Sequence, residues 1–161
     1  MTLAPPTRTM GVVDRLAVGT DVIEIGRVRR AVERYGARFL ERVYTDLERA
    51  LYAARPHELA ARFAAKEAVM KALGTGVRGV AWREIEVLPD RRGKPRVHLH
   101  GRARARAEAI GLAALDVSLT HSGELAIAVA VGARAGRPEP EDDLPAWRRR
   151  LEQYLRERGG L

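Results

Sequence analysis

PHELAARFAAKEAVMKALGTG, at residues 56–76, predicts one long helix from about Pro56 to Leu73, which Gly74 and Gly76 bring to an end. Residues four apart lie along one stripe of a helix. The stripe here is Leu59, Phe63, Glu67 and Lys71, with Arg62, Lys66 and Val69 on the neighbouring one. It is therefore apolar at its start and charged at its end.

The end of this helix also suggests a binding site. The turn Gly74-Thr75-Gly76 offers backbone amides, which suit an anionic group. Cations beside Glu67 and close to such a turn indicate a phosphate site with a metal ion. Two simpler interpretations stay open: Glu67 and Lys71 as a solvated pair worth a few tenths of a kcal/mol, and a glycine turn that only ends the helix.

The segments around the helix predict an α+β fold, an antiparallel sheet with helices packed on it. LAVGTDVIEI, at 16–25, alternates as a strand does. Helices are expected at about 26–36, 46–54, 101–111 and 145–158, with 37–45 as a connection, and strands at 84–88, 96–100, 117–121 and 125–131. The domains predicted are an N-terminal extension at 1–13, a core at 14–133, and a linker with a C-terminal helix at 134–161.

Two polar residues stand out on these strands. Asp21 shares a strand face with Gly19 and Ile23, where a carboxylate needs a cation, a metal or a backbone donor. His121 ends the strand VSLTH just before a glycine turn. Taken alone, either residue is explained by a structural role. His57, His98 and His100 have no metal-site spacing, and the glycine fingerprints of nucleotide kinases and serine hydrolases are missing.

Composition excludes several classes of protein. The 161 residues suffice for one ordinary domain with a core, and 46% of them are hydrophobic. There is no cysteine, which excludes disulfides, thiolate zinc sites and cysteine nucleophiles and fits a cytoplasmic protein. No apolar run is long enough for a membrane span, and the N-terminus does not resemble a secretory signal.

The charge of +8 favours anionic partners, namely nucleic acid, phosphorylated cofactors or acidic proteins. Only 5% of the residues are aromatic, which argues against stacking on single-stranded nucleic acid. Lys66, Lys71 and Lys94 are the three lysines among 29 basic residues. They therefore either mark places where arginine cannot serve or survive by chance.

Three segments together resemble the holo-[acyl-carrier-protein] synthase family, the small 4'-phosphopantetheinyl transferases. They are VGTDVIEIGRV at 18–28, RFAAKEAVMKALGTG at 62–76 and VSLTHSGELAIAVAV at 117–131. Gly93-Lys94-Pro95 falls where the family has a similar turn. The resemblance covers about 17–132 and implies an enzyme that moves 4'-phosphopantetheine from coenzyme A to a serine of apo-acyl carrier protein, releasing adenosine 3',5'-bisphosphate.

The resemblance also implies roles for individual residues. Asp21 and Glu67 match the family's Mg²⁺ ligands, and Lys71 matches the lysine beside the pyrophosphate. Arg27 matches the arginine that meets the acidic carrier protein. The coenzyme A pocket is matched by Arg62, Lys66, Gly74, Thr75, Gly76 and His121, with Lys94 and Pro95 expected to serve a neighbouring subunit's site. The general base stays open between Glu67 and a water on the metal helped by Asp21.

Family members of this kind are trimers with sites between subunits, so a homotrimer is expected. They act in fatty acid biosynthesis, although these residues do not decide whether the carrier belongs to fatty-acid or polyketide synthesis. The extensions at 1–13 and 134–161 exceed the usual family chain. The alternative function is a non-catalytic trimeric module that binds a carrier protein or a nucleotide. A nucleic-acid-binding domain is supported by charge alone.

Overall fold

The computed structural model describes residues 15–135 and 144–159, with the backbone alone at 144–147. The elements are β1 (Arg15–Glu24), α1 (Ile25–Tyr35), α2 (Ala37–Val43), α3 (Asp46–Tyr52), α4 (Pro56–Leu73), α5 (Gly76–Gly79), a 3-10 turn (Trp82–Glu84), β2 (Ile85–Pro89), β3 (Pro95–Leu99), α6 (Gly101–Ala109), β4 (Leu112–Ser122), β5 (Leu125–Arg134) and α7 (Leu144–Glu157). The predicted 1–13 extension and residues 136–143 of the linker lie outside the described residues. No helix in the described part has the length and hydrophobicity needed to cross a membrane.

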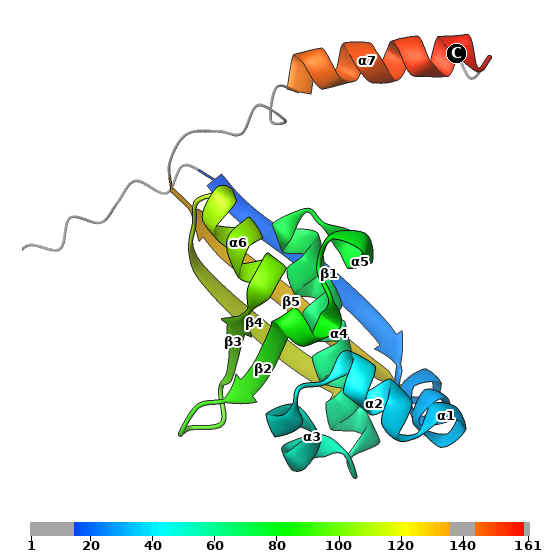
Figure 1. Cartoon of the computed structure of the whole chain (residues 1–161), viewed down its shortest axis with the longest axis vertical. Helices are drawn as coiled ribbons and strands as arrows, with labels where there is room; N and C mark the ends of the chain where they lie inside the picture. Colours follow the sequence, from blue (N-terminus) through cyan, green and yellow to red (C-terminus); the bar gives the residue numbers. More distant parts are fainter. Residues whose placement is uncertain (1–14, 136–143, 160–161) are drawn as a thin grey trace, which may run out of the picture.

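The strands form two antiparallel sheets, and helices pack on them (Figure 1). The larger sheet has the order β1-β5-β4, and β2 pairs with β3 in a separate hairpin. The predicted α+β class is confirmed, with the five strands divided between two sheets. The hairpin meets β4 through side chains, because Lys94 Nζ and Arg96 Nη1 lie 3.2 and 3.4 Å from the Asp116 carboxylate.

Helix α4 is the centre of the core and begins and ends where the sequence predicts. Gly74 adopts φ 71°, a left-handed conformation that glycine tolerates, and so ends the helix. The helix lies very close to β1: a Cβ on Gly19 would sit 1.9 Å from the backbone oxygen of Ala68. This close approach requires glycine at position 19, and it brings Asp21, two residues further along the strand, beside the charged half of α4.

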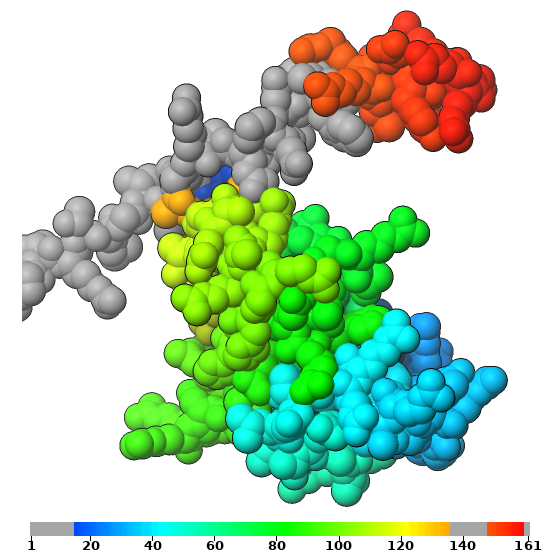
Figure 2. Space-filling model, viewed as in Figure 1, coloured from blue at the N-terminus to red at the C-terminus, as the bar shows by residue number. Residues whose placement is uncertain are grey.

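Helices α5 and α6 lie on the same face of the larger sheet as α4 (Figure 1). In the space-filling view, helical residues hide most of that sheet from this side (Figure 2). Helices α1 to α3 gather beyond the end of β1 (Figure 1). Residues 37–43, expected as a connection, form α2, because Gly36 at φ 53° breaks the chain into two helices. β4 starts at Leu112, five residues earlier than predicted.

The opposite face of the larger sheet is exposed, and it is mainly apolar along β1 and β5. Alternate residues of these strands point to this face, where Val131 and Ile127 of β5 lie opposite Val18 and Val22 of β1. The large apolar residues of these two strands that point to this face are each between 37% and 65% exposed; they are Leu16, Val18, Val22, Leu125, Ile127, Val129 and Val131. A contiguous apolar surface of this kind is typical of a protein interface.

Candidate functional site

The two carboxylates predicted to bind metal line one cavity of about 930 Å³. Asp21 comes from β1 and Glu67 from the middle of α4. The cavity lies between the end of β1, helices α1 and α2, α4 and the 3-10 turn. Its polar lining also includes arginines of α1 and α2, and aromatic residues complete it; the charged and aromatic members are Asp21, Arg27, Tyr35, Arg38, Phe39, Arg42, Phe63, Glu67 and Trp82.

Asp21 is held in place by Lys71. The Lys71 ammonium donates to Asp21 Oδ1 at 2.9 Å and to the Thr20 carbonyl oxygen at 2.7 Å. The Asp21 side chain is 18% exposed and that of Lys71 is 52% exposed. The sequence pairs Lys71 with Glu67 along one helix stripe, but the lysine instead reaches across to β1. Asp21 Oδ1 therefore has a cationic partner, whereas Oδ2 forms no hydrogen bond or ion pair with the residues that the structure describes.

Glu67 is held in place by Trp82, a residue that no sequence pattern singles out. The indole Nε1 of Trp82 donates to Glu67 Oε1 at 2.6 Å. The ring is itself packed against Phe63, with 5.9 Å between ring centroids, and the Arg42 guanidinium lies 5.8 Å from its centroid. A carboxylate that is hydrogen-bonded through one oxygen has its orientation set while the other oxygen can bind a ligand.

Trp82 left little signal in the sequence. It stands alone between Val80 and the strand EIEVL, outside every periodic pattern. Its role depends on contacts with α4, fifteen residues earlier in the chain, and only the fold brings these together. The sequence feature that could have drawn attention to Trp82 is the scarcity of tryptophan, with two residues in the whole chain.

Arg62 and His121 do not line this cavity; they lie toward the first turns of α4. Arg62 forms an ion pair with Glu58, and its guanidinium stacks on Tyr52 with 3.7 Å from Cζ to the ring centroid. Its Nε is buried and has no hydrogen-bond partner among the described residues. His121 is exposed near the end of β4, 4.9 Å between ring centroids from His57.

The glycine turn lies at the other end of the same helix. Gly74 follows the last residue of α4, and Thr75 and Gly76 lead directly into α5. Arg62 precedes Gly74 by 12 residues, which is about 18 Å along the helix axis. Arg62 and His121 therefore lie well away from the turn, and within one chain the predicted coenzyme A residues do not form one pocket.

Lys94 and Pro95 are placed apart from both groups, at the tip of the β2–β3 hairpin, which projects from the body of the molecule (Figures 1 and 2). Lys94 pairs with Asp116 of β4, and Pro95 is the first residue of β3. In one chain this turn contacts neither the cavity nor the glycine turn. That Lys94 and Pro95 contribute to the coenzyme A site of a neighbouring subunit stays a prediction.

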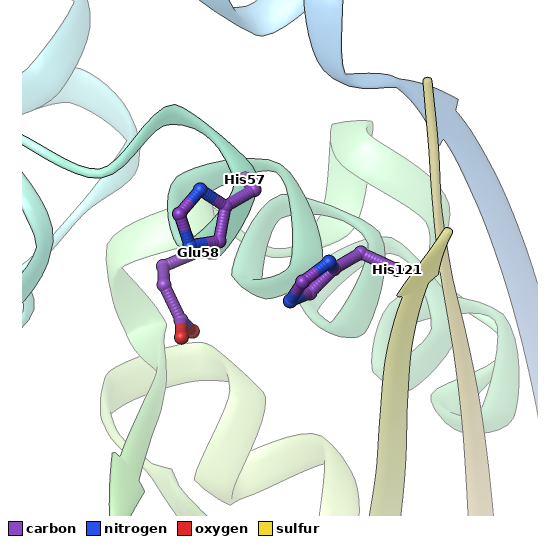
Figure 3. A group of neighbouring side chains, drawn as sticks. All are labelled: His57, Glu58 and His121. Atoms are coloured by element: carbon purple, nitrogen blue, oxygen red, sulfur yellow. The ribbon is translucent and has the colours of Figure 1, made fainter. Parts of the chain in front are cut away.

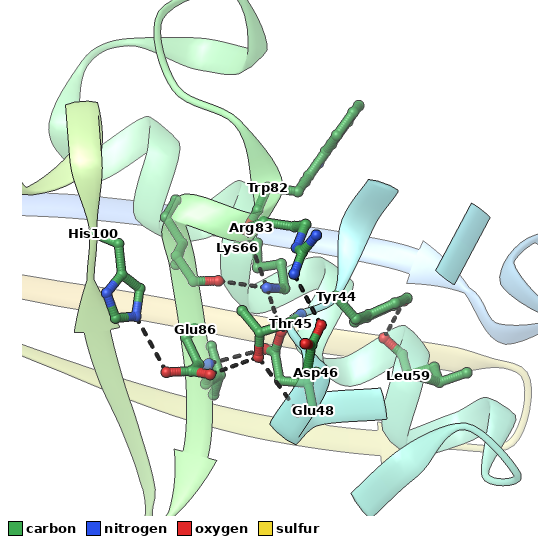
Figure 4. Close-up of polar contacts among 12 residues, drawn as sticks. Tyr44, Thr45, Asp46, Glu48, Leu59, Lys66, Trp82, Arg83, Glu86 and His100 are labelled. Carbon is green, nitrogen blue, oxygen red and sulfur yellow. Dashed lines mark hydrogen bonds and ion pairs between the residues drawn. The ribbon is translucent and has the colours of Figure 1, made fainter. Parts of the chain in front are cut away.

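The position of Lys66 differs from the prediction that it contacts coenzyme A. Its side chain is 0% exposed, and its ammonium donates to Glu48 Oε2 at 2.7 Å, to the Trp82 carbonyl oxygen at 3.1 Å and to the Ile85 carbonyl oxygen (Figure 4). Burial lowers the pKa of Lys66, and the Glu48 carboxylate opposes that shift. Lys66 is thus a core residue that joins α4 to α3 and β2, and it presents no surface to a ligand.

A polar network extends from this buried pair. The Glu48 carboxylate also accepts from the backbone N–H of Thr45 and of Val87, each at 2.9 Å. Thr45 Oγ1 donates to Glu86 at 2.6 Å, and His100 Nε2 lies 3.1 Å from the same carboxylate (Figure 4). Burial by itself would raise the pKa of Glu86, but the bonds from Thr45 and His100 lower it below its usual value. The network fixes the hairpin that carries Trp82 at its base.

Comparison with known proteins identifies the family. Residues 17–130 match the model of the 4'-phosphopantetheinyl transferase superfamily. A holo-[acyl-carrier-protein] synthase of Roseiflexus sp. (strain RS-1) is 53% identical over 90 residues, which are 52% of this chain and 65% of that protein. The aligned segment therefore spans just under two thirds of that relative's length.

Solved structures agree with this match. The Helicobacter pylori holo-[acyl-carrier-protein] synthase in complex with coenzyme A superposes with a TM-score of 0.67 at 28% identity, covering 72% of this chain and 99% of that one. The Chronobacterium ammoniagenes synthase–coenzyme A complex gives a TM-score of 0.68 at 34% identity, covering 77% of this chain and 100% of that one. The chain therefore belongs to the 4'-phosphopantetheinyl transferase superfamily and, within it, to the holo-[acyl-carrier-protein] synthases.

Proposed function

We propose that this chain transfers 4'-phosphopantetheine from coenzyme A to a serine hydroxyl of apo-acyl carrier protein and releases adenosine 3',5'-bisphosphate. The observation that carries the proposal is the convergence of Asp21 and Glu67, from a strand and a helix, on one cavity that Arg27 also lines. Relatives solved with coenzyme A support the donor substrate. Relatives named as synthases of the holo-carrier support the acceptor.

The donor set of the cavity fits Mg²⁺. This ion prefers hard oxygen ligands and usually keeps water and phosphate oxygens alongside one or two carboxylates. Asp21 and Glu67 supply two carboxylates, each with one oxygen already oriented, by Lys71 and by Trp82. When bound there, the ion would neutralise charge on the pyrophosphate of coenzyme A.

The reaction also needs a base for the serine hydroxyl and positive charge beside the leaving phosphate, and residues of this chain can supply both. The serine oxygen forms a bond to the phosphorus of the phosphopantetheine group, while the bond from that phosphorus to the adenosine bisphosphate breaks. The serine proton goes to a base, for which Glu67 and a water beside Asp21 are the two candidates. Lys71, which already contacts Asp21, supplies positive charge next to the departing phosphate and has protons to donate to it.

Arg27 is proposed to meet the carrier protein. It is exposed, lies on the first turn of α1 and lines the cavity. Because carrier proteins are acidic, Arg27→Ala should raise the KM for the carrier and weaken its salt dependence, while the KM for coenzyme A stays nearly constant. A raised KM for coenzyme A alone would place Arg27 with the other substrate.

We also propose that the active form is a homotrimer with sites shared between subunits. The exposed apolar face of β1 and β5 supports an interface on the larger sheet. The separation of Arg62 and His121 from the Gly74–Gly76 turn supports a pocket that two chains complete. Light scattering coupled to gel filtration should give three times the chain mass, and Val18→Lys with Ile127→Lys should give the monomer. A parent protein that runs as a monomer while active would contradict the shared site.

Mass spectrometry of the carrier protein tests the function itself. The protein is incubated with coenzyme A, Mg²⁺ and an apo-acyl carrier protein, and the carrier should gain the mass of one phosphopantetheinyl group. Carrier that binds the protein but gains no mass, with both substrates and Mg²⁺ saturating, would indicate a non-catalytic binding module instead.

A cytoplasmic location stays a prediction.

A further inference from the structure

Three side chains with metal-binding atoms converge outside the cavity described above. His57 and Glu58 lie on the first turn of α4, and His121 lies near the end of β4 (Figure 3). One ligand atom from each lies within 4.8 Å of the others. No pattern in the sequence predicts this group, because 63 positions separate Glu58 from His121 and only the packing of α4 on the sheet joins them.

The position of each residue has a local cause. Pro56 occupies the first helical position, so His57 and Glu58 follow on the opening turn of α4. His121 is on the face of β4 that also carries Val117 and Leu119, and Val117 is buried in the core beside α4. The two imidazole rings meet at a tilt of 53° with 4.9 Å between centroids. The backbone that carries the three side chains is therefore fixed by regular secondary structure, α4 for two of them and β4 for the third.

The chemistry of the three donors indicates which ions they suit. Two imidazole nitrogens and one carboxylate are a set typical of Zn²⁺ and similar first-row metals, whereas Mg²⁺ prefers oxygen alone. Zinc lies about 2.0–2.1 Å from each nitrogen, so tetrahedral donors are about 3.4 Å apart. The present separations, at most 4.8 Å, need only modest side-chain rotation to reach this spacing.

Access and charge set the conditions for binding. His57 and His121 are exposed, so an ion can reach them from solvent. Glu58 is already paired with Arg62, so a metal must share that carboxylate with the guanidinium or displace it. Arg62 stays anchored without Glu58, because its guanidinium also stacks on Tyr52. Because Arg62 competes for the carboxylate, the two imidazole nitrogens must supply most of the affinity. The site therefore suits a metal that binds nitrogen strongly.

We propose that His57, Glu58 and His121 form a Zn²⁺ site that is separate from the Asp21–Glu67 cavity. The site is completed by water in the remaining coordination position. The binding of zinc does not depend on the proposed function. A consequence for catalysis does rest on it: His121 and Arg62 are predicted contacts of coenzyme A, so zinc at this site and coenzyme A should exclude one another.

Calorimetric titration of the metal-free full chain with ZnCl₂, in a buffer that does not chelate, tests the site. The parent should bind one zinc per chain. His121→Asn and His57→Asn should each weaken binding at least about 10–100-fold, the typical cost of losing even an outer-shell partner of a metal ligand. His98→Asn is the matched control, because His98 is an exposed strand histidine outside the group, and it should bind as the parent does. Circular dichroism confirms that each variant is folded.

Cobalt(II) absorption gives a second readout that needs no enzyme activity. The parent should show the visible bands of a site with nitrogen ligands, and the His57→Asn/His121→Asn double variant should lose them. Equal zinc binding by the parent and the double variant would overturn the site. If zinc binds as proposed but leaves the affinity for coenzyme A unchanged, the exclusion is wrong and the metal site stands.

Discussion

Replacing Lys66 by methionine should destabilise the fold strongly and affect coenzyme A binding little. Methionine keeps the length of the aliphatic stem but removes the ammonium. The ammonium is 0% exposed and serves a buried carboxylate, that of Glu48, and two backbone carbonyl oxygens. In Lys66→Met the Glu48 charge therefore stays buried without its cation.

The size of the effect follows from this burial. Removing one partner of a buried ion pair costs about 3–5 kcal/mol, mainly because the remaining charge is left uncompensated. The two carbonyl oxygens that lose a donor place Lys66→Met toward the upper end of that range. The double variant Lys66→Met/Glu48→Gln should be less destabilised than Lys66→Met, because the isolated charge is gone.

Urea unfolding measures these differences, and one fixed protein concentration is used because we propose that the protein forms a homotrimer. Lys94→Met is the matched control: Lys94 also pairs with a carboxylate, but its side chain is 49% exposed. Its loss should cost about 0–1 kcal/mol. If Lys66→Met unfolds like the parent but binds coenzyme A much more weakly, Lys66 is a ligand contact and the structural role is refuted.

Three further substitutions test other parts of the structure. Gly19→Ala would place a methyl group 1.9 Å from the Ala68 carbonyl oxygen, so α4 must shift; we expect a loss of about 1–3 kcal/mol in unfolding free energy, and an unchanged midpoint would contradict the close approach. Trp82→Phe keeps the ring but removes the indole donor to Glu67, and calorimetry should find Mg²⁺ affinity about 10–100-fold weaker, with equal affinity ruling out an orienting role. The pKa of Glu86 lies below its ordinary 4.5, so its carboxylate stabilises the fold at neutral pH, and this stability is lost as the pH falls below 4.5 and through the lowered value. Glu86→Gln should therefore lose less stability than the parent between pH 6 and 3 in urea unfolding, and parallel curves would show that this carboxylate is not responsible.

The elements that local pattern determines were predictable. The bounds of α4 agree with the sequence because its glycines and its helical pattern act locally. Strand alternation predicted that Asp21 shares a face with Gly19 and Ile23, and in the structure this face packs on α4. The segment 37–43 was missed as a helix because seven residues carry too little periodicity to be distinguished from a connection.

Contacts between distant segments were not predictable in the same way. In the sequence, Lys66 occupies a helix stripe with Arg62 and looks like any other charged residue of α4. Only the packing of α3 and β2 on α4 shows that its ammonium is in the core. The scarcity of lysine left open whether Lys66 is required, and the structure shows its ammonium buried against Glu48. The donor from Trp82 to Glu67 and the pairing of His57 with His121 likewise depend on tertiary structure alone.

The transfer reaction run with two matched carboxylate variants tests the central claim, that Asp21 and Glu67 together form the catalytic centre. Parent, Asp21→Asn, Glu67→Gln and the control Glu108→Gln are each incubated with coenzyme A, apo-carrier protein and limiting Mg²⁺, and the carrier is weighed by mass spectrometry over time. Glu108 is an exposed carboxylate on α6 that pairs with Arg104 and lies outside the cavity. We expect the parent and Glu108→Gln to add one phosphopantetheinyl group at similar rates, while the other two slow by several orders of magnitude and stay folded. Near-parent rates in both Asp21→Asn and Glu67→Gln would contradict it.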